Sequence, residues 1–151
     1  MTGCGCALTR RAFVLGTVGA ALVAGRAGAQ TAEVAAEVLG RGRTDYAEEL
    51  GGPAELITLK LTFPPGSMLP WHLHPGPVYG IVNSGELTVY QSDGCKAVYG
   101  PGSVVIIPRD TVHEEHNEGA VPIEAISTFL LLEGSPVRVP ATPPDAVCPA
   151  G

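Results

Sequence analysis

Short apolar segments separated by turn residues fill the middle of the chain, and this pattern constrains the fold more than any other feature. The segment 56–63 alternates the apolar side chains Ile57, Leu59 and Leu61 with polar ones. A period of two residues is typical of a strand with one buried face. No long helical period interrupts residues 55–133. We therefore predict an all-β domain there, a sandwich or a small barrel.

Turn residues divide this domain into further predicted strands. Asn83, Ser84 and Gly85 form a turn signature, and we expect the segments on either side of it to pair as a hairpin. The predicted strands cover residues 56–63, 78–82, 86–91, 96–99, 103–107, 112–117 and 123–132. Residues 30–54 are predicted to form an N-terminal lead-in, either helical or extended. Residues 134–151 hold five prolines and are predicted to form a loose C-terminal tail.

The first 29 residues have the parts of an export signal in the usual order. Arg10 and Arg11 lie in a stretch without acidic residues, an apolar run covers 12–24, and small residues at 27–29 offer a peptidase site. This run is too short to span a bilayer, which takes about 20 residues, but it fits the apolar region of a signal peptide. We predict cleavage after Ala29, and a short buried helix is the alternative.

The Arg-Arg-x-Phe sequence ending at Phe13 resembles a twin-arginine (Tat) export signal. The resemblance implies a periplasmic or secreted protein that is exported already folded and keeps no stable membrane anchor. Tat export is common for proteins that load a metal or cofactor before they leave the cytoplasm.

The chain that remains after the signal is acidic. It carries six basic and 15 acidic side chains, a net charge of −9. Such a charge argues against nucleic acid or an anionic membrane surface as a partner. A small-molecule ligand is the kind of partner that this acidic charge does not argue against.

Two cysteines, Cys95 and Cys148, remain after the predicted cleavage. In an oxidising compartment they could form a disulfide that ties down the tail. Two unpaired thiols are the alternative, because the sequence does not give the distance between the two Cα atoms.

All four histidines of the chain lie within residues 72–116. His72 and His74 are two residues apart, so both imidazoles project from the same face of an extended segment. Two imidazoles at this spacing can bind one metal ion from one strand. Imidazole suits zinc, copper, iron and nickel.

Two runs of residues around the histidines resemble the paired motifs of the cupin superfamily, whose members are jelly-roll barrels of the double-stranded β-helix type. The first motif, G-(x)5-H-x-H-(x)3,4-E-(x)6-G, is matched at Gly66, His72, His74 and Gly85. The second motif, G-(x)5-P-x-G-(x)2-H-(x)3-N, is matched at Gly102, Pro108, His113 and Asn117. The resemblance implies a cupin barrel over residues 55–133, with a divalent metal held by His72, His74 and His113.

The chain departs from these motifs at two positions. Asp110 replaces the glycine of the second motif, and aspartate tolerates turn geometry. Val78 stands where the first motif has a glutamate, and neither Val78 nor the adjacent Tyr79 is a carboxylate. Three histidines still leave open coordination positions for water or substrate. The metal stays open among Fe, Zn, Cu, Ni and Mn, and the lost negative charge disfavours Mn and Fe.

Glu115 is the candidate to replace the missing glutamate. It lies two residues after His113, so both side chains project to the same face of a regular strand. Glu115 could act as a fourth ligand or as a general base beside the metal, and the alternative is a solvated acid at a strand end. His116 is expected on the opposite face, at the surface.

These features predict an exported metal-binding cupin protein that acts as a dioxygenase-like or isomerase-like enzyme on a small organic substrate. The alternative is a non-catalytic periplasmic barrel that binds a small ligand or a metal. A structural barrel without metal is a third hypothesis. The sequence shows no nucleophile–base pair and no binding motif for an organic cofactor. The resemblance also suggests a homodimer, for which the apolar strands 56–63 and 123–132 are candidates because exposed strand edges need a cover.

Overall fold

A computed structural model describes residues 32–45 and 50–148 of the chain. The predicted signal segment 1–29 lies outside these residues. The described part of the chain contains no apolar helix of membrane-spanning length.

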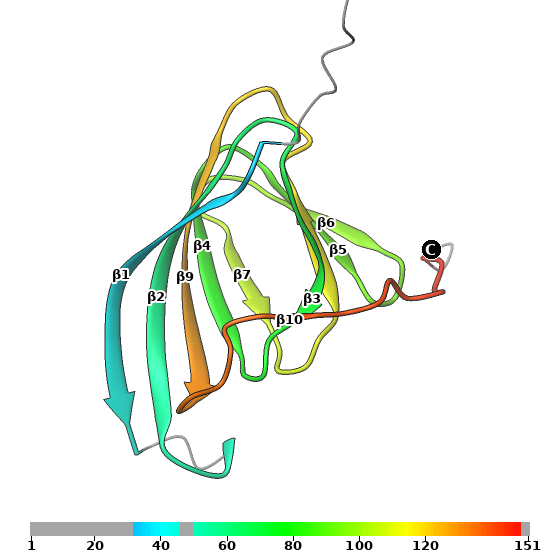
Figure 1. The fold of residues 1–151 in the computed structure, drawn as a ribbon. Coiled ribbons are helices and arrows are strands. Elements are labelled where there is room, and N and C mark those ends of the chain that lie inside the picture. The colour runs from blue at the N-terminus through cyan, green and yellow to red at the C-terminus, as the bar shows by residue number, and fades with distance from the viewer. Residues whose placement is uncertain (1–31, 46–49, 149–151) are drawn as a thin grey trace, which may run out of the picture.

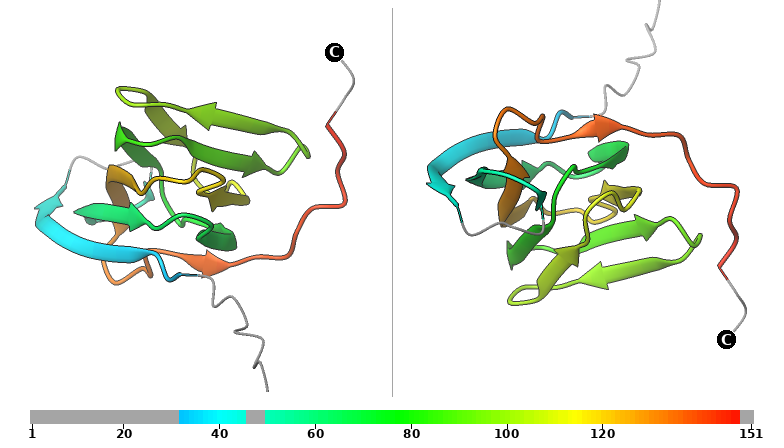
Figure 2. Two further views of the ribbon diagram at one scale, coloured as in Figure 1. Left: turned by 90° about the horizontal axis from the view of Figure 1, so that it is seen from above. Right: turned by 90° about the horizontal axis from the view of Figure 1, so that it is seen from below.

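The described residues form ten strands in two five-stranded antiparallel sheets that face each other (Figures 1 and 2). The first sheet has the order β1-β2-β9-β4-β7, and the second has the order β10-β3-β8-β5-β6. The prediction of an all-β jelly roll is therefore confirmed. The strands are β1 (Ala35–Thr44), β2 (Ala54–Phe63), β3 (Met68–Leu73), β4 (Val78–Ser84), β5 (Leu87–Gln91), β6 (Lys96–Tyr99), β7 (Val104–Ile107), β8 (His113–His116), β9 (Ile123–Leu132) and β10 (Val139–Pro140).

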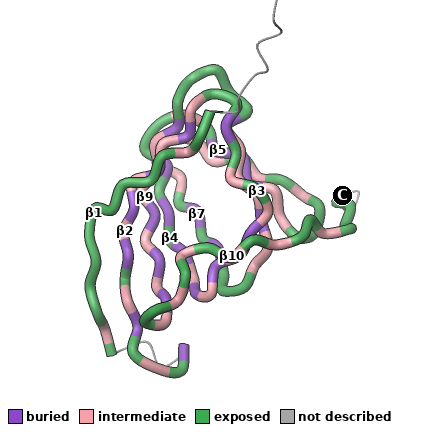
Figure 3. The backbone as a smooth tube through the Cα atoms, viewed as in Figure 1, coloured by how far each residue is buried: buried purple, intermediate pink, exposed green. Residues whose placement is uncertain are grey.

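The core lies between the two sheets and is built on β2 and β9. These strands pair along their whole length, and almost every second side chain of each is buried (Figure 3). Phe63 and Ile123 face each other across the pair, and both are 0% exposed. Burying a large apolar side chain stabilises the folded state by about 1.5–3 kcal/mol. The alternation read from the sequence of 56–63 is therefore the alternation of a strand with one face in the core.

The hairpin predicted around Gly85 is wrong, because β4 and β5 lie in different sheets. β4 pairs with β7 and β9, whereas β5 pairs with β6 and β8. The turn at 83–85 instead carries the chain from the first sheet to the second. Gly85 has a φ of 76°, and a Cβ atom there would lie 2.8 Å from Cγ1 of Ile123. A side chain is excluded at this turn on both grounds.

The N-terminal lead-in is extended and adds a strand to the first sheet. β1 runs antiparallel to β2, from Ala35 opposite Thr62 to Thr44 opposite Ala54. Of the two conformations considered for residues 30–54, the structure therefore shows the extended one at 35–44. Its side chains are almost all exposed, so this strand carries no alternation that the sequence could reveal.

The prediction of a loose tail is wrong, because residues 134–148 form a strap that pairs with the β3 edge of the second sheet and then runs to the β5–β6 loop (Figure 2). We call these residues the C-terminal strap. β10 pairs with Leu73 and His72 of β3, and the Ala141 N–H donates to the Trp71 carbonyl at 2.9 Å. A disulfide joins Cys148 to Cys95 in the loop between β5 and β6. Proline removes single N–H donors but leaves the other backbone groups of a strand able to pair.

The strands suggested for a homodimer are interior strands of the first sheet. β2 lies between β1 and β9, and β9 lies between β2 and β4. Both edges of each strand are already paired, so the argument that they need a cover is wrong. The homodimer itself stays a prediction.

Candidate metal centre

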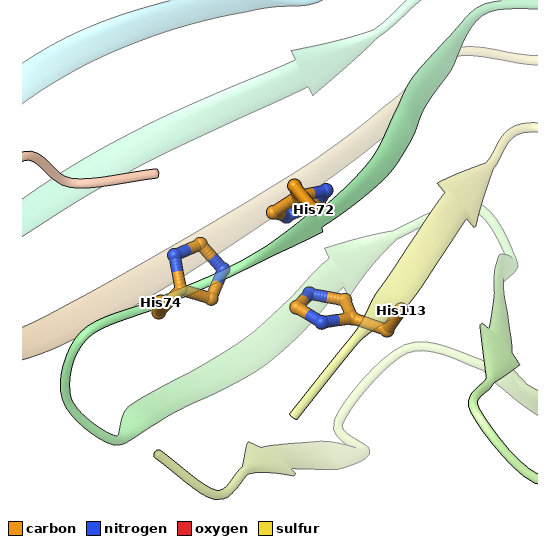
Figure 4. Close-up of side chains that lie close together, drawn as sticks. All are labelled: His72, His74 and His113. Carbon is orange, nitrogen blue, oxygen red and sulfur yellow. The ribbon is translucent and has the colours of Figure 1, made fainter. Parts of the chain in front are cut away.

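Three histidines meet on the inner face of the second sheet. His72 and His74 point the same way from β3 and the residue after it, and His113 of β8 lies directly opposite His72 in the strand pairing (Figure 4). The ring centroids are 4.2 Å apart for His72 and His113, 4.9 Å for His72 and His74, and 5.1 Å for His74 and His113. One nitrogen from each ring lies within 4.8 Å of the other two. The structure thus brings together the three predicted ligands.

The backbone fixes the tautomer of all three imidazoles. Nδ1 of His72 bonds to the Pro70 carbonyl at 2.7 Å, Nδ1 of His74 to the Val137 carbonyl at 2.6 Å, and Nδ1 of His113 to the Thr111 carbonyl at 2.9 Å; these are the hydrogen bonds of the three rings. A carbonyl oxygen only accepts hydrogen bonds, so each Nδ1 carries the proton. Each neutral ring then keeps its lone pair on Nε2.

The Nε2 atoms of His72 and His113 are buried and have no hydrogen-bond partner. Buried polar atoms without a partner are rare, because the loss of hydration costs about 1–3 kcal/mol for each one. A divalent transition metal would satisfy these lone pairs. The carbonyls on the Nδ1 side would then be the outer hydrogen bonds that orient metal-bound imidazoles.

Two of these carbonyls come from the chain just before the histidine. Pro70 lies in β3, where the pairing with β8 shifts register between Leu69 and His72, and Thr111 follows the turn after β7. Pro70 and Thr111 each lie two residues before the histidine that they orient. The turn after β7 also reaches β3, because the Asp110 N–H donates to the His74 carbonyl at 2.9 Å. Asp110 has a φ of 58° and is the one described residue other than glycine with a positive φ. The left-handed conformation at this position explains why the family motif has glycine here and why aspartate can replace it.

Burial keeps the three rings neutral. His72 and His113 are each 1% exposed, and His74 is 5% exposed. Burial and the neighbouring His113 lower the pKa of His72 to about 3, and burial lowers the pKa of His74 to about 4. Burial also lowers the pKa of His113. Neutral imidazoles with free lone pairs at neutral pH are the form that binds a metal.

A cavity of about 280 Å³ opens beside His72 and His74. Val78 lines it, so the position of the motif glutamate is an apolar wall, while Tyr79 is half exposed on the outside. Glu115 lines the same cavity, and burial raises the pKa of its carboxyl to about 7. The group of converging ligand atoms in the described part of the chain holds the three imidazoles without Glu115.

Sequence reasoning missed the contribution of the C-terminal strap. The strap provides the Val137 carbonyl that orients His74, and both Val137 and Arg138 line the cavity. No local pattern links Val137 to His74, because 63 residues separate them. His116 lies outside the cluster, beside Glu114 and Tyr90.

The comparisons with known proteins agree with this geometry. The cupin domain family matches residues 59–129, a range that includes the three histidines. No curated protein matches the chain in sequence.

Solved structures share the fold of the cupin domain. An uncharacterised conserved protein with a double-stranded β-helix domain from Klebsiella pneumoniae superimposes with a TM-score of 0.58 and 20% identity, over 75% of this chain and 88% of that one. A cupin superfamily protein from Desulfitobacterium hafniense superimposes with a TM-score of 0.53 and 16% identity, over 69% of this chain and 83% of that one. The DMSP lyase DddQ from Ruegeria pomeroyi superimposes with a TM-score of 0.52 and 22% identity, over 58% of this chain and 44% of that one. At these identities the likeness concerns the fold.

Proposed function

We propose that this protein is a metal-dependent cupin enzyme that acts on a small organic molecule in the cavity beside the histidines. The observation that carries the proposal is the set of three imidazoles whose protons are fixed on Nδ1 by backbone carbonyls, with the Nε2 atoms of His72 and His113 buried and unpartnered. No hydrogen bond within the described residues uses these two lone pairs.

The residues divide the work between binding and orientation. His72, His74 and His113 would hold the metal, which when bound supplies Lewis-acid or oxygen-activating chemistry. The cavity walls exclude water and hold the substrate beside His72 and His74. Glu115 lines the same cavity and is placed to exchange a proton with the bound molecule. Dioxygenase-like and isomerase-like reactions are the two classes that we propose.

We also propose export to the periplasm or beyond by the Tat-like signal of residues 1–29. The paired arginines and the apolar run support this location. The disulfide between Cys95 and Cys148 supports it independently, because structural disulfides persist mainly in oxidising compartments. The location is tested by a fusion to the first 29 residues and by the same fusion with Arg10→Lys and Arg11→Lys.

Elemental analysis of protein matured through its own export route tests the metal centre. We expect close to one equivalent of a transition metal, and its loss in a His72→Ala, His113→Ala double variant. His116→Ala is the matched control, since this fourth histidine lies outside the cluster and its variant should keep the metal. Absence of metal from the parent protein, or an equal loss in the control, contradicts the proposal. Circular dichroism shows whether the double variant folds.

A non-catalytic barrel that binds a small ligand or a metal is the second candidate. Val78 favours it, because this apolar residue occupies the position of the family's acidic ligand. Turnover distinguishes the two candidates. A metal-loaded sample that consumes oxygen or converts a bound molecule is an enzyme, and a Glu115→Gln variant should then lose rate while it keeps metal. A loaded sample that binds small molecules without converting them is a binding protein.

A further inference from the structure

Arg138 differs from every other cationic side chain of the described residues. The five remaining lysines and arginines each have a carboxylate within 4 Å: Arg41–Glu55, Arg43–Glu133, Lys60–Glu124, Lys96–Glu118 and Arg109–Asp110. Arg138 has no such partner among the residues that the structure describes, although the chain outside the signal carries 15 acidic side chains. An arginine left unpaired in so acidic a protein has its donors free for something else.

Arg138 lies between the cavity beside the histidines and the protein surface. It follows Val137 in the C-terminal strap and lines the 280 Å³ cavity together with His72, His74 and Glu115. It also lines a groove on the outside, together with Pro70 and Glu33. Glu33 and Arg138 form no ion pair across this groove. The arginine is exposed. It therefore stands where the cavity meets solvent, with its charge available to a molecule that enters.

The other walls of the cavity are mainly apolar. Among them is the ring of Phe129, which packs edge-on against His74 with centroids 5.1 Å apart. The apolar lining residues are Val34, Ala36, Leu59, Leu61, Leu69, Val78, Ile107, Phe129 and Val137. A pocket with apolar walls and a few placed polar groups selects a ligand with an apolar body and one polar end.

We propose that the cavity takes a small organic monocarboxylate, whose carboxylate pairs with Arg138 and whose apolar body lies between the aliphatic walls and Phe129. Arginine presents two parallel N–H donors that match a carboxylate. The body of the ligand then extends toward His72 and His74. This inference deepens the proposed function, because it names the substrate class of the same cavity.

Two features of the cavity limit the size and the charge of the ligand. A cavity of about 280 Å³ lies just below the usual range for ligand pockets, which is roughly 300–1,000 Å³. A second carboxylate on the ligand would meet Glu115 with no second cation among the lining residues. The fit is therefore to a monocarboxylate of the size of benzoate, rather than to a dicarboxylate or a larger acid.

Calorimetric titration with benzoate and its neutral isostere benzamide tests the inference. The protein is used both free of metal and loaded with metal, so that direct binding to the metal is separated from binding to Arg138. In both forms we expect benzoate to bind at least about tenfold more tightly than benzamide, as charge-assisted hydrogen bonds require. Succinate should bind more weakly than benzoate.

Three variants locate the effect. Arg138→Gln should weaken benzoate at least about tenfold and leave benzamide unchanged, while Arg138→Lys should recover part of the loss. Arg41→Gln removes the same charge from an exposed pair with Glu55 and should leave both ligands unchanged. All three variants should keep their metal content, since Arg138 is not among the potential ligands.

Several results would overturn the inference. These are an absence of benzoate binding, equal binding of benzoate and benzamide, an undiminished affinity in Arg138→Gln, or an equal loss in Arg41→Gln. Each of them leaves the elemental analysis untouched. Failure of the anion site and failure of the metal centre are therefore distinguishable.

Discussion

The Nδ1 of His74 bonds to the carbonyl of Val137 at 2.6 Å, across 63 residues of chain. This bond makes the C-terminal strap part of the candidate metal centre, because it fixes the proton on Nδ1 and the lone pair on Nε2. The strap is held at one end by two residues of β10 and at the other by the disulfide of Cys148. The orientation of one candidate ligand thus depends on a segment outside residues 59–129, the range that matches the cupin domain family.

Loss of the disulfide should weaken both the fold and the metal centre. In Cys148→Ser we expect the free energy of unfolding to fall by about 2–4 kcal/mol, because the bond closes a loop between residues 53 apart. The metal should leave faster, since the Val137 carbonyl is then less firmly placed. Urea unfolding and the rate of metal transfer to a chelator measure the two effects. Cys95→Ser should behave the same way, and two different outcomes would argue against a shared bond.

A carboxylate restored at Val78 should change the choice of metal. Val78 lines the cavity beside His72 and His74, so Val78→Glu should raise the affinity for Mn²⁺ relative to Zn²⁺, as harder metals favour oxygen ligands. The metal-free variant should be less stable by about 1–3 kcal/mol because it buries a polar group without a partner. Competition between the two metals measures the first effect. Tyr79→Glu is the control, because Tyr79 is 50% exposed, and a similar shift there would contradict the placement of Val78.

The stability of the metal-free protein should fall as the pH falls below about 6.5. The pKa is lowered to about 3 for His72 and about 4 for His74, against 6.5 for an unperturbed histidine. Between pH 6.5 and the lowered pKa values, the histidines are protonated in the unfolded chain but stay neutral in the folded chain. Acid therefore favours unfolding. Each histidine contributes at most about 1.4 kcal/mol per pH unit.

Glu115 should act in the opposite direction. Its pKa is raised to about 7 from 4.5, so the folded chain binds a proton that the unfolded chain releases, and this contribution grows as the pH falls toward 4.5. Urea unfolding at pH 7, 6 and 5 should show a net loss from the histidines. The loss should be smaller in His72→Gln and larger in Glu115→Gln. A pH-independent free energy of unfolding would show that the rings are not buried as described.

Asp110 should respond to substitution according to its backbone angle. Asp110→Gly should change the free energy of unfolding by less than about 1 kcal/mol, since glycine adopts a φ of 58° readily. Asp110→Val should cost about 1–2 kcal/mol or more, because a β-branched residue is strained there. Thermal unfolding compares the pair. If both variants lose the same free energy of unfolding, the ion pair of Asp110 with Arg109 contributes more to stability than the backbone angle does.

The sequence predicted those parts of the fold that depend on local alternation. β6 (Lys96–Tyr99) and β9 (Ile123–Leu132) have the predicted bounds. β2 was predicted to within two residues at one end. The spacing of His72 and His74 predicted that the two side chains share one face. The resemblance to the cupin motifs added His113, which the structure places opposite His72.

The features that the sequence did not predict depend on long-range contacts or on exposed strands. β1 has almost no buried side chain, so it shows no period. β10 is two residues long and contains Pro140. The turn at Gly85 was read correctly as a turn, but local residues do not say which sheet the next strand joins. Arg138 was not named, because the absence of an acidic partner is visible only when all the ion pairs are known.

The position of the strap along the chain sets the order in which the centre is completed. A ribosome makes the strands β1 to β9, and with them all three histidines, before it makes residues 134–148. Until the strap is in place, His74 lacks its carbonyl partner and the cavity lacks the wall that carries Arg138. The geometry of the histidine cluster is therefore completed only once residues 134–148 have been made and have docked. The cysteines that secure the strap can join only where oxidation is permitted.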